Sequence, residues 1–300
     1  MHRTAIRLAA AIALLTQCAM SFAYITHDTN FPPNSPQGNV VNVSYAFTDR
    51  RPARYFSVIT TAFTFNAISS SPRGSRFVAT SFWLDPLNGS GGGDQLYMGI
   101  NPTQPKDNYP GQAHFSYFGS HGGTLYSRNC AAGADGGGGI TCAIDVPTTQ
   151  GYTYRLDAKL TEATSVHSVL QGWLTVFDST GTQLNQQKIG EFEVVRGNMG
   201  LSYPQSWVEG SSDPCSDLVK TSITFRPLVL TLTRGRTYEV VVDTVPSNKC
   251  GVYAEPVGLN AYGKPGGTKM TYGVCTTPTC MKNAASDDHD TDANRESPAE

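Results

Sequence analysis

The sequence has few charged residues and no surplus of either sign. Asp, Glu, Lys and Arg make up 15% of the 300 residues, with 22 basic against 24 acidic side chains, whereas soluble domains usually have about 25%. Nucleic-acid binders need a cationic surplus to neutralise phosphates, so this balance excludes that class. Hydrophobic residues at 39% and aromatic residues at 10% can form a core, which excludes wholesale disorder.

Long apolar runs are absent after the N-terminal segment. That segment places Leu8–Met20 behind the cations Arg3 and Arg7, and Ser21-Phe22-Ala23 supplies small residues at a cleavage site. The pattern predicts a secretory signal peptide over 1–23. The apolar run is too short for a bilayer, which needs about 20 residues. We therefore expect a protein without a membrane span, secreted into the extracellular space or the periplasm.

The cysteines fit an oxidising compartment. One of the seven, Cys18, lies in the signal peptide, and an even number in an exported chain indicates disulfides. No CxxC motif is present, so a zinc site is not predicted. Six cysteines allow 15 pairings. Proximity in sequence favours the pairs Cys130–Cys142, Cys215–Cys250 and Cys275–Cys280.

Composition divides the chain into five parts. After the signal peptide, residues 24–51 form a polar N-terminal arm, and 52–250 form the predicted β-sandwich domain. Residues 251–282 are a disulfide-bearing extension, and 283–300 are an acidic tail predicted to be disordered. Without the signal peptide and the tail, the body is close to neutral.

Short runs of β-branched and aromatic residues, separated by turn clusters, predict strands. Many of the runs alternate apolar and polar residues, as in Thr153–Leu160, and no segment has a helical period over three turns. So many strands without helices predict an all-β, antiparallel two-sheet sandwich of jelly-roll or lectin-like type. The predicted strands are Val40–Phe47, Tyr55–Phe65, Arg76–Leu84, Gln95–Ile100, Ala113–Phe118, Tyr152–Leu160, Ser168–Asp178, Leu184–Val195, Ser206–Glu209, Ser222–Leu232 and Thr237–Thr244.

Residues for nucleophilic or metal chemistry do not form a recognisable set. Ser120 and His121 are neighbours, so in extended chain their side chains point apart. The six histidines form no HExxH motif, and 287–292 lack the glycine and closing glutamate of a calcium loop. We predict no cofactor. A structural calcium ion is possible in a sandwich domain, but nothing in the sequence indicates one.

Three glutamates are the weak catalytic candidates. Glu191 and Glu193 lie two apart, on one face of a predicted strand with Cβ atoms about 7 Å apart. A pair of carboxylates is what glycoside hydrolysis requires. Glu209 is a lone candidate in a turn-rich stretch beside Trp207. A solvent-facing sheet edge explains the first pair equally well, and an ordinary hydrogen-bonding role explains Glu209.

Aromatic residues are dense for so few charges. Exposed rings stack on sugar faces, and Trp207, Tyr97 and Tyr117 are the candidate ligand-binding residues. The competing interpretation of each ring is core packing. Trp207 is the best candidate for exposure because Ser, Gly and Pro surround it.

A series of motifs in order resembles a known family. It includes Tyr97-Met98-Gly99-Ile100-Asn101, Ala113–Gly119, the Cys pair around a Gly-rich loop, Gly172–Asp178, and Trp207-Val208-Glu209 ahead of Cys215. The chain is similar over about 55–230 to secreted microbial proteins known only as a domain of unknown function. It departs from their pattern by Asn101 in place of Gln and by the added C-terminal part. The resemblance implies export, a β-sandwich and disulfides, and it lends no catalytic residues.

The leading hypothesis is binding of an extracellular glycan or cell-surface ligand without catalysis. The alternatives are a glycan-cleaving enzyme, either a hydrolase or a lyase, that uses a carboxylate pair, and a structural or interaction protein of the secretome. No nucleic-acid partner is expected.

Overall fold

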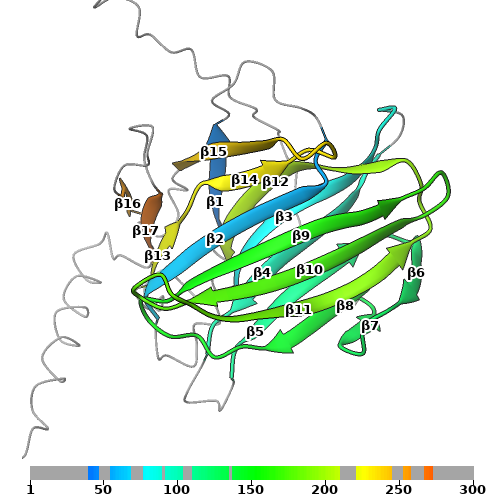
Figure 1. The fold of residues 1–300 in the computed structure, drawn as a ribbon. Coiled ribbons are helices and arrows are strands. Elements are labelled where there is room, and N and C mark those ends of the chain that lie inside the picture. Colours follow the sequence, from blue (N-terminus) through cyan, green and yellow to red (C-terminus); the bar gives the residue numbers. More distant parts are fainter. Residues whose placement is uncertain are drawn as a thin grey trace, which may run out of the picture.

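The computed structural model is a sandwich of two antiparallel β-sheets (Figure 1), which confirms the predicted fold class. It describes residues 40–46, 55–68, 77–89, 92–103, 110–134, 137–209, 221–244, 253–257 and 267–272. The predicted signal peptide, the acidic tail and Cys215, Cys250, Cys275 and Cys280 lie outside these residues. In the described part of the chain no helix has the length and hydropathy needed to span a membrane.

Sheet A forms one layer, with β3, β4, β5 and β8 behind the front sheet in Figure 1. Neighbouring strands pair in the order β1, β12, β3, β4, β5, β8, β7, and all pairs are antiparallel. The strand bounds are β1 Val40–Ala46, β12 Met199–Glu209, β3 Phe77–Pro86, β4 Asp94–Asn101, β5 Gln112–Phe118, β8 Ile140–Asp145 and β7 Cys130–Ala132.

Sheet B forms the other layer, with β2, β9, β10 and β11 at its centre. β6 pairs with β11 at one edge, and β13 and β14 lie along β2 toward the other, followed by β17 and β16. The bounds are β2 Val58–Ala67, β9 Thr153–Ala163, β10 Ser168–Phe177, β11 Gln183–Val194, β6 Gly122–Leu125, β13 Thr221–Phe225, β14 Leu228–Thr231, β16 Tyr253–Pro256 and β17 Thr268–Tyr272.

One strand connects the two sheets. β15 (Thr237–Thr244) pairs with β14 of sheet B through its first half and with β1 of sheet A through its second half. Hydrogen bonding therefore continues around this edge of the sandwich, and no sheet edge is left open between β14 and β1.

The core lies between the two sheets and is rich in rings. Phe65 packs edge-on against Tyr154, and Phe192 packs against both Phe115 and Tyr117 across the layers. Each fully buried side chain of this size contributes about 1.5–3 kcal/mol relative to exposure. Gly172 makes room for this packing, since a Cβ there would lie 2.5 Å from the Phe115 ring.

Strands occur at nearly all predicted positions, with two differences of length. Ser206–Glu209 is the end of the longer β12, which continues past a register shift between Ser202 and Gln205. Pro204, which cannot donate to a ladder, lies in that irregularity, where proline is tolerated. The predicted Ser222–Leu232 is two strands, β13 and β14, that pair with successive parts of β2.

Five short strands are missing from the sequence prediction. β6, β7 and β8 are short strands that pair with β11, β8 and β5, respectively. β16 and β17 fall within 251–282, which was expected to be less regular, and they extend sheet B beyond β13. β1 comes from the segment predicted to be an arm. Both flanking segments thus contribute strands to the sandwich.

Candidate functional site

The outer face of sheet A is defined by strand alternation. On β3 the even-numbered residues from Val78 to Leu84 point into the core and are fully buried. The register then places the odd-numbered residues of β3 beside outward positions of β4, β5 and β12. The outward residues of the central strands include Phe77, Ala79, Ser81 and Trp83 of β3, Gln95, Tyr97, Gly99 and Asn101 of β4, Gln112, His114, Ser116 and Phe118 of β5, and Gln205, Trp207 and Glu209 of β12.

Five rings on this face form a contiguous cluster, which we call the aromatic face. Tyr97 is central, with ring centroids 5.0 Å from Phe118, 5.2 Å from Phe77 and 6.1 Å from Trp207. Phe77 also lies 6.3 Å from Trp207 and 5.7 Å from His114. Most contacts are edge-to-face, the arrangement that aromatic quadrupoles favour. Tyr97 is 8% exposed, whereas the other four rings are partly exposed.

Two small residues shape the centre of the aromatic face. Ala79 and Gly99 are directly paired between β3 and β4, with Trp207 on one side of them and His114 on the other. A Cβ on Gly99 would lie 2.5 Å from Phe77 Cζ and 2.7 Å from the Cβ of Ala79. The absence of a side chain at Gly99 therefore lets the Phe77 ring lie low over β4.

Polar groups surround the rings. Asn101 Nδ2 lies 3.2 Å from His114 Nε2, and Gln112 Nε2 donates to Asp145 Oδ1 at 3.1 Å. The described strands of sheet A carry no lysine or arginine. The face can therefore offer aromatic surface, amides, hydroxyls and the carboxylates of Asp145 and Glu209, without a lysine or arginine from these strands.

Glu191, a sequence candidate, lies on the outer face of the other sheet. Its carboxylate accepts from Lys188 Nζ and from Gln171 Nε2, the latter at 3.0 Å. The Lys188 ammonium is the main reason why the pKa of Glu191 is lowered. A carboxylate held ionised in this way is poorly suited to act as a general acid.

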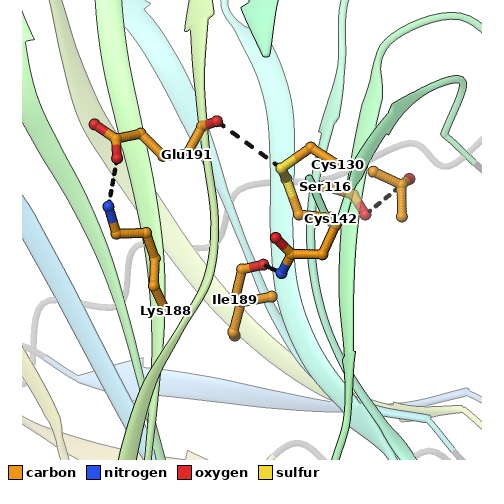
Figure 2. Close-up of a disulfide and its surroundings, with 8 residues drawn as sticks. Ser116, Cys130, Cys142, Lys188, Ile189 and Glu191 are labelled. Atoms are coloured by element: carbon orange, nitrogen blue, oxygen red, sulfur yellow. Dashed lines mark hydrogen bonds and ion pairs between the residues drawn. A yellow bond between two sulfur atoms is a disulfide. The ribbon is translucent and has the colours of Figure 1, made fainter. Parts of the chain in front are cut away.

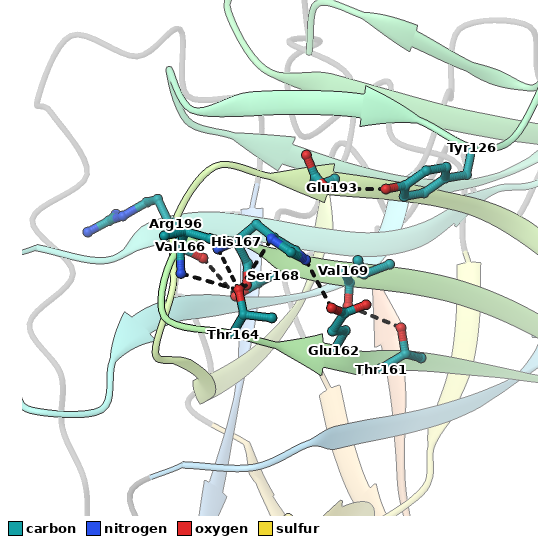
Figure 3. Close-up of polar contacts among 10 residues, drawn as sticks. All are labelled: Tyr126, Thr161, Glu162, Thr164, Val166, His167, Ser168, Val169, Glu193 and Arg196. Atoms are coloured by element: carbon teal, nitrogen blue, oxygen red, sulfur yellow. Dashed lines mark hydrogen bonds and ion pairs between the residues drawn. The ribbon is translucent and has the colours of Figure 1, made fainter.

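Glu193 follows on the same face and is held by another residue. Tyr126 Oη donates to Glu193 Oε2 at 3.1 Å (Figure 3). This hydrogen bond also raises the pKa of Tyr126. Glu162 of β9 lies across Val169 from Glu193, and its Oε1 is 3.0 Å from His167 Nε2. The Glu191 and Glu193 carboxylates thus have separate partners.

Glu209 lies in sheet A, whereas the other two candidates lie in sheet B. It lies exposed at the end of β12, opposite Phe77, on the outer face of sheet A. Two packed layers therefore separate Glu209 from Glu191 and Glu193, and these three glutamates cannot act on one sugar bond together.

The ligand-binding candidates are divided between surface and core. Trp207 and Tyr97 both belong to the aromatic face. Tyr117 points inward, is fully buried, and its hydroxyl donates to Asp94 Oδ2 at 2.8 Å. Burial and this carboxylate raise its pKa. Its inward position follows from strand parity, because it is one residue away from the outward Phe118. Its ring is therefore not available for a ligand on either outer face.

Sequence reasoning missed Phe77 and His114 as members of the cluster. The signal for Phe77 was the alternation of β3, since its even-numbered residues are buried and Phe77 has the opposite parity, together with Trp83. The sequence does not show that β12 pairs with β3, whose residues Thr80 and Ser206 are 126 positions apart.

One predicted disulfide lies among the described residues and is confirmed. Cys130 and Cys142 are bonded to each other and are directly opposite in the β7–β8 pair. Figure 2 shows the bond beside the Lys188–Glu191 segment of β11. A Cβ on Gly190 would lie 2.3 Å from Cys142 Sγ, so the glycine allows β11 to approach the disulfide closely. In the described residues no group of three or more metal-ligating side chains is present.

No protein-family model matches the sequence, and no curated protein matches it. The resemblance to the secreted family therefore has no family-model support. Of its implications, the structure shows the β-sandwich and one disulfide.

Three solved structures are similar to the chain at low identity. Scytalido-glutamic peptidase with a peptide-based transition state analogue has a TM-score of 0.37 and 10% identity, covering 78% of this chain and 98% of its own. SCP-B, of the eqolisin family of peptidases, has a TM-score of 0.34 and 10% identity, covering 78% and 96%. A protein of unknown function from Shewanella oneidensis MR-1 has a TM-score of 0.22 and 13% identity, covering 59% and 77%. Scores of this size assign neither an activity nor catalytic residues to this chain.

Proposed function

We propose that this protein is exported and binds a neutral extracellular glycan through the aromatic face of sheet A. The observation that carries the proposal is the contiguous ring cluster of Phe77, Tyr97, His114, Phe118 and Trp207 on the outward side of a sheet. A solvent-facing antiparallel sheet ordinarily carries polar residues there. A patch of rings in such a place is typical of a binding surface.

The chemistry around the rings favours a neutral, hydroxyl-rich ligand. Aromatic faces supply apolar contact for the C–H side of a sugar, and amides can both donate to and accept from its hydroxyls. Gln95, Asn101, Gln112 and Gln205 lie among the outward residues. Because the described strands of sheet A contain no lysine or arginine, they offer no cation to pair with an acidic sugar.

Export is supported by the disulfide and by the predicted signal peptide. A buried disulfide such as Cys130–Cys142 is typical of proteins that fold in an oxidising compartment. Extracellular and periplasmic glycans are the sugars that such a protein meets.

The test is affinity measurement on an array of neutral polysaccharides, with released sugar measured in the same samples. Trp207→Ala removes a partly exposed ring of the aromatic face, and we expect the affinity of this variant to fall about tenfold or more. Trp173→Ala is the matched control, because it removes the same side chain from the outer face of sheet B. Trp207→Phe should retain part of the affinity if ring stacking is the source of binding.

Equal losses in the Trp207 and Trp173 variants, or no binding to any neutral polysaccharide, would overturn the proposal. Release of sugar would instead favour a glycan-cleaving enzyme. Since Trp207 packs on Phe77 and Tyr97, a thermal melt of each variant must first show that the fold is retained.

A further inference from the structure

A second cluster of cations and an aromatic ring lies on the opposite outer face, in sheet B. Lys159 of β9 and Lys188 of β11 flank Trp173 of β10, with each Nζ 5.3 Å and 5.5 Å, respectively, from the centroid of the indole ring. The two ammonium groups are therefore within about 11 Å of each other. The indole Nε1 donates to Gln171 Oε1 at 3.0 Å, which limits rotation of the ring.

The charges of this cluster do not balance. Lys188 is paired with Glu191, and Arg155 Nε lies 3.5 Å from Asp157 Oδ2. Asp157 also accepts from Thr60 Oγ1 at 2.6 Å, so its oxygens are occupied within the sheet. Among the described residues, Lys159 has neither a carboxylate nor a hydrogen-bond acceptor as partner. One positive charge is left over beside the indole ring.

Lys188 already has the Glu191 carboxylate as its partner, whereas Lys159 has only the indole ring, so Lys159 is the group to which an incoming anion can bind. A cation–π contact at an exposed site is a weak interaction, and lysine side chains are long and flexible, so an incoming anion can replace the ring as their partner. The ring then becomes available to the apolar side of a sugar. A ligand that carries both a negative charge and a sugar ring satisfies both groups.

We propose that the Lys159–Trp173–Lys188 cluster is a binding site for an acidic polysaccharide. A carboxylate or sulfate of the polymer pairs with Lys159, whose charge is not balanced by Glu191, and the sugar ring contacts Trp173. This site is independent of the aromatic face, because it is built from strands of the other sheet. With both sites, one molecule binds a neutral glycan on one face and an acidic glycan on the other.

The experiment compares polygalacturonate with its methyl ester, which has the same backbone without the charge. We expect binding to polygalacturonate and at least about tenfold weaker binding to the ester. Lys159→Gln should lower the affinity for polygalacturonate about tenfold, whereas Lys159→Arg should retain it. Trp173→Ala should also weaken binding, and Trp207→Ala should not.

Further arms separate the site from general charge attraction. Arg128→Gln is the matched control, since it removes one exposed cation between β6 and β7 and should leave the affinity unchanged. Dextran sulfate distinguishes sulfate from carboxylate as the preferred anion, and polyglutamate tests whether the sugar is needed. Raising the salt concentration should weaken binding to the acidic polymer.

Two results would overturn the proposal. One is equal affinity for polyglutamate and polygalacturonate, which means that charge alone is recognised. The other is an unchanged affinity in Lys159→Gln, or an equal loss in Arg128→Gln. Because neutral glycan binding depends on Trp207 and not on Lys159, failure of this site leaves the proposed function of the aromatic face untouched, and the reverse also holds.

Discussion

The two outer faces of the sandwich are built on similar antiparallel sheets and differ in their chemistry. The strands of sheet A carry no lysine or arginine, whereas those of sheet B carry Arg155, Lys159, Lys188 and Lys269. Rings on sheet A contact one another, as Tyr97 does with Phe118. Rings on sheet B contact cations instead, as Trp173 does with two lysines and Phe177 does with Arg155.

This difference shows how a sandwich separates stability from recognition. Successive residues of a strand alternate between the two faces of its sheet, so the inward set can be kept apolar while the outward set varies. In β9, Tyr154, Leu156 and Ala158 are fully buried in the core, while the alternate positions Arg155 and Lys159 face outward. The same fold can thus present one face without lysine or arginine and one face with both.

The largest expected effect comes from the disulfide, which affects both faces. Replacing Cys130 and Cys142 together by Ala removes a disulfide between residues that are 12 apart in sequence. We expect the free energy of unfolding to fall by about 3 kcal/mol. The bond lies where β8 of sheet A meets β11 of sheet B, so both faces should weaken together. Denaturant unfolding measures the loss, with Ala132→Ser on exposed β7 as the control.

If the double variant lost binding on one face and kept it on the other, the disulfide would belong to that site rather than to the sandwich. Binding by both faces should therefore be measured well below the melting temperature of the variant.

A smaller effect, confined to sheet A, is expected from Gly99→Val. The new side chain would occupy the place of the Phe77 ring, and overpacking of this kind costs about 2 kcal/mol. Neutral glycan binding should fall with it, while binding to polygalacturonate should not change. Ala131→Val adds methyl groups on exposed β7, three strands away from β4, and is the control. Equal stability of the two variants would show that Phe77 moves aside without cost.

Local patterns in the sequence predicted most strands, because the period of two and the turn residues are local properties. The disulfide Cys130–Cys142 was also predictable, since the two residues are close in sequence. The short strands β6 and β7 were not, because their residues have little intrinsic preference for strand and are ordered by pairing with β11 and β8.

The candidate site was predicted only in part, and the reason is long-range pairing. Trp207 and Tyr97 were identified singly from composition. Their contact requires β12 to pair with β3, and β3 with β4, which no local pattern specifies. Tyr117 illustrates the same limit at the scale of one residue. Its neighbour Phe118 faces outward, and one step along the strand places Tyr117 in the core.

The smallest expected effect is on the ion pair Lys188–Glu191 of sheet B. Its contribution to the free energy of unfolding should depend on pH and salt. The Lys188–Glu191 pair is partly exposed, with 34% and 22% of the two side chains accessible, so solvent screening limits its contribution to about 0.5 kcal/mol. Because the pKa of Glu191 is lowered in the folded protein, this stabilisation is present above the pKa of an unfolded glutamate. It is lost as the pH falls through the lowered value.

The difference in unfolding free energy between the wild type and Glu191→Gln should therefore shrink toward zero in acid and in high salt. The matching difference for Trp207→Phe on sheet A, a substitution that removes no charged side chain, should depend on neither. A gap for Glu191→Gln that persists unchanged in acid would show that the glutamate stabilises sheet B through its hydrogen bond to Gln171 rather than through its charge.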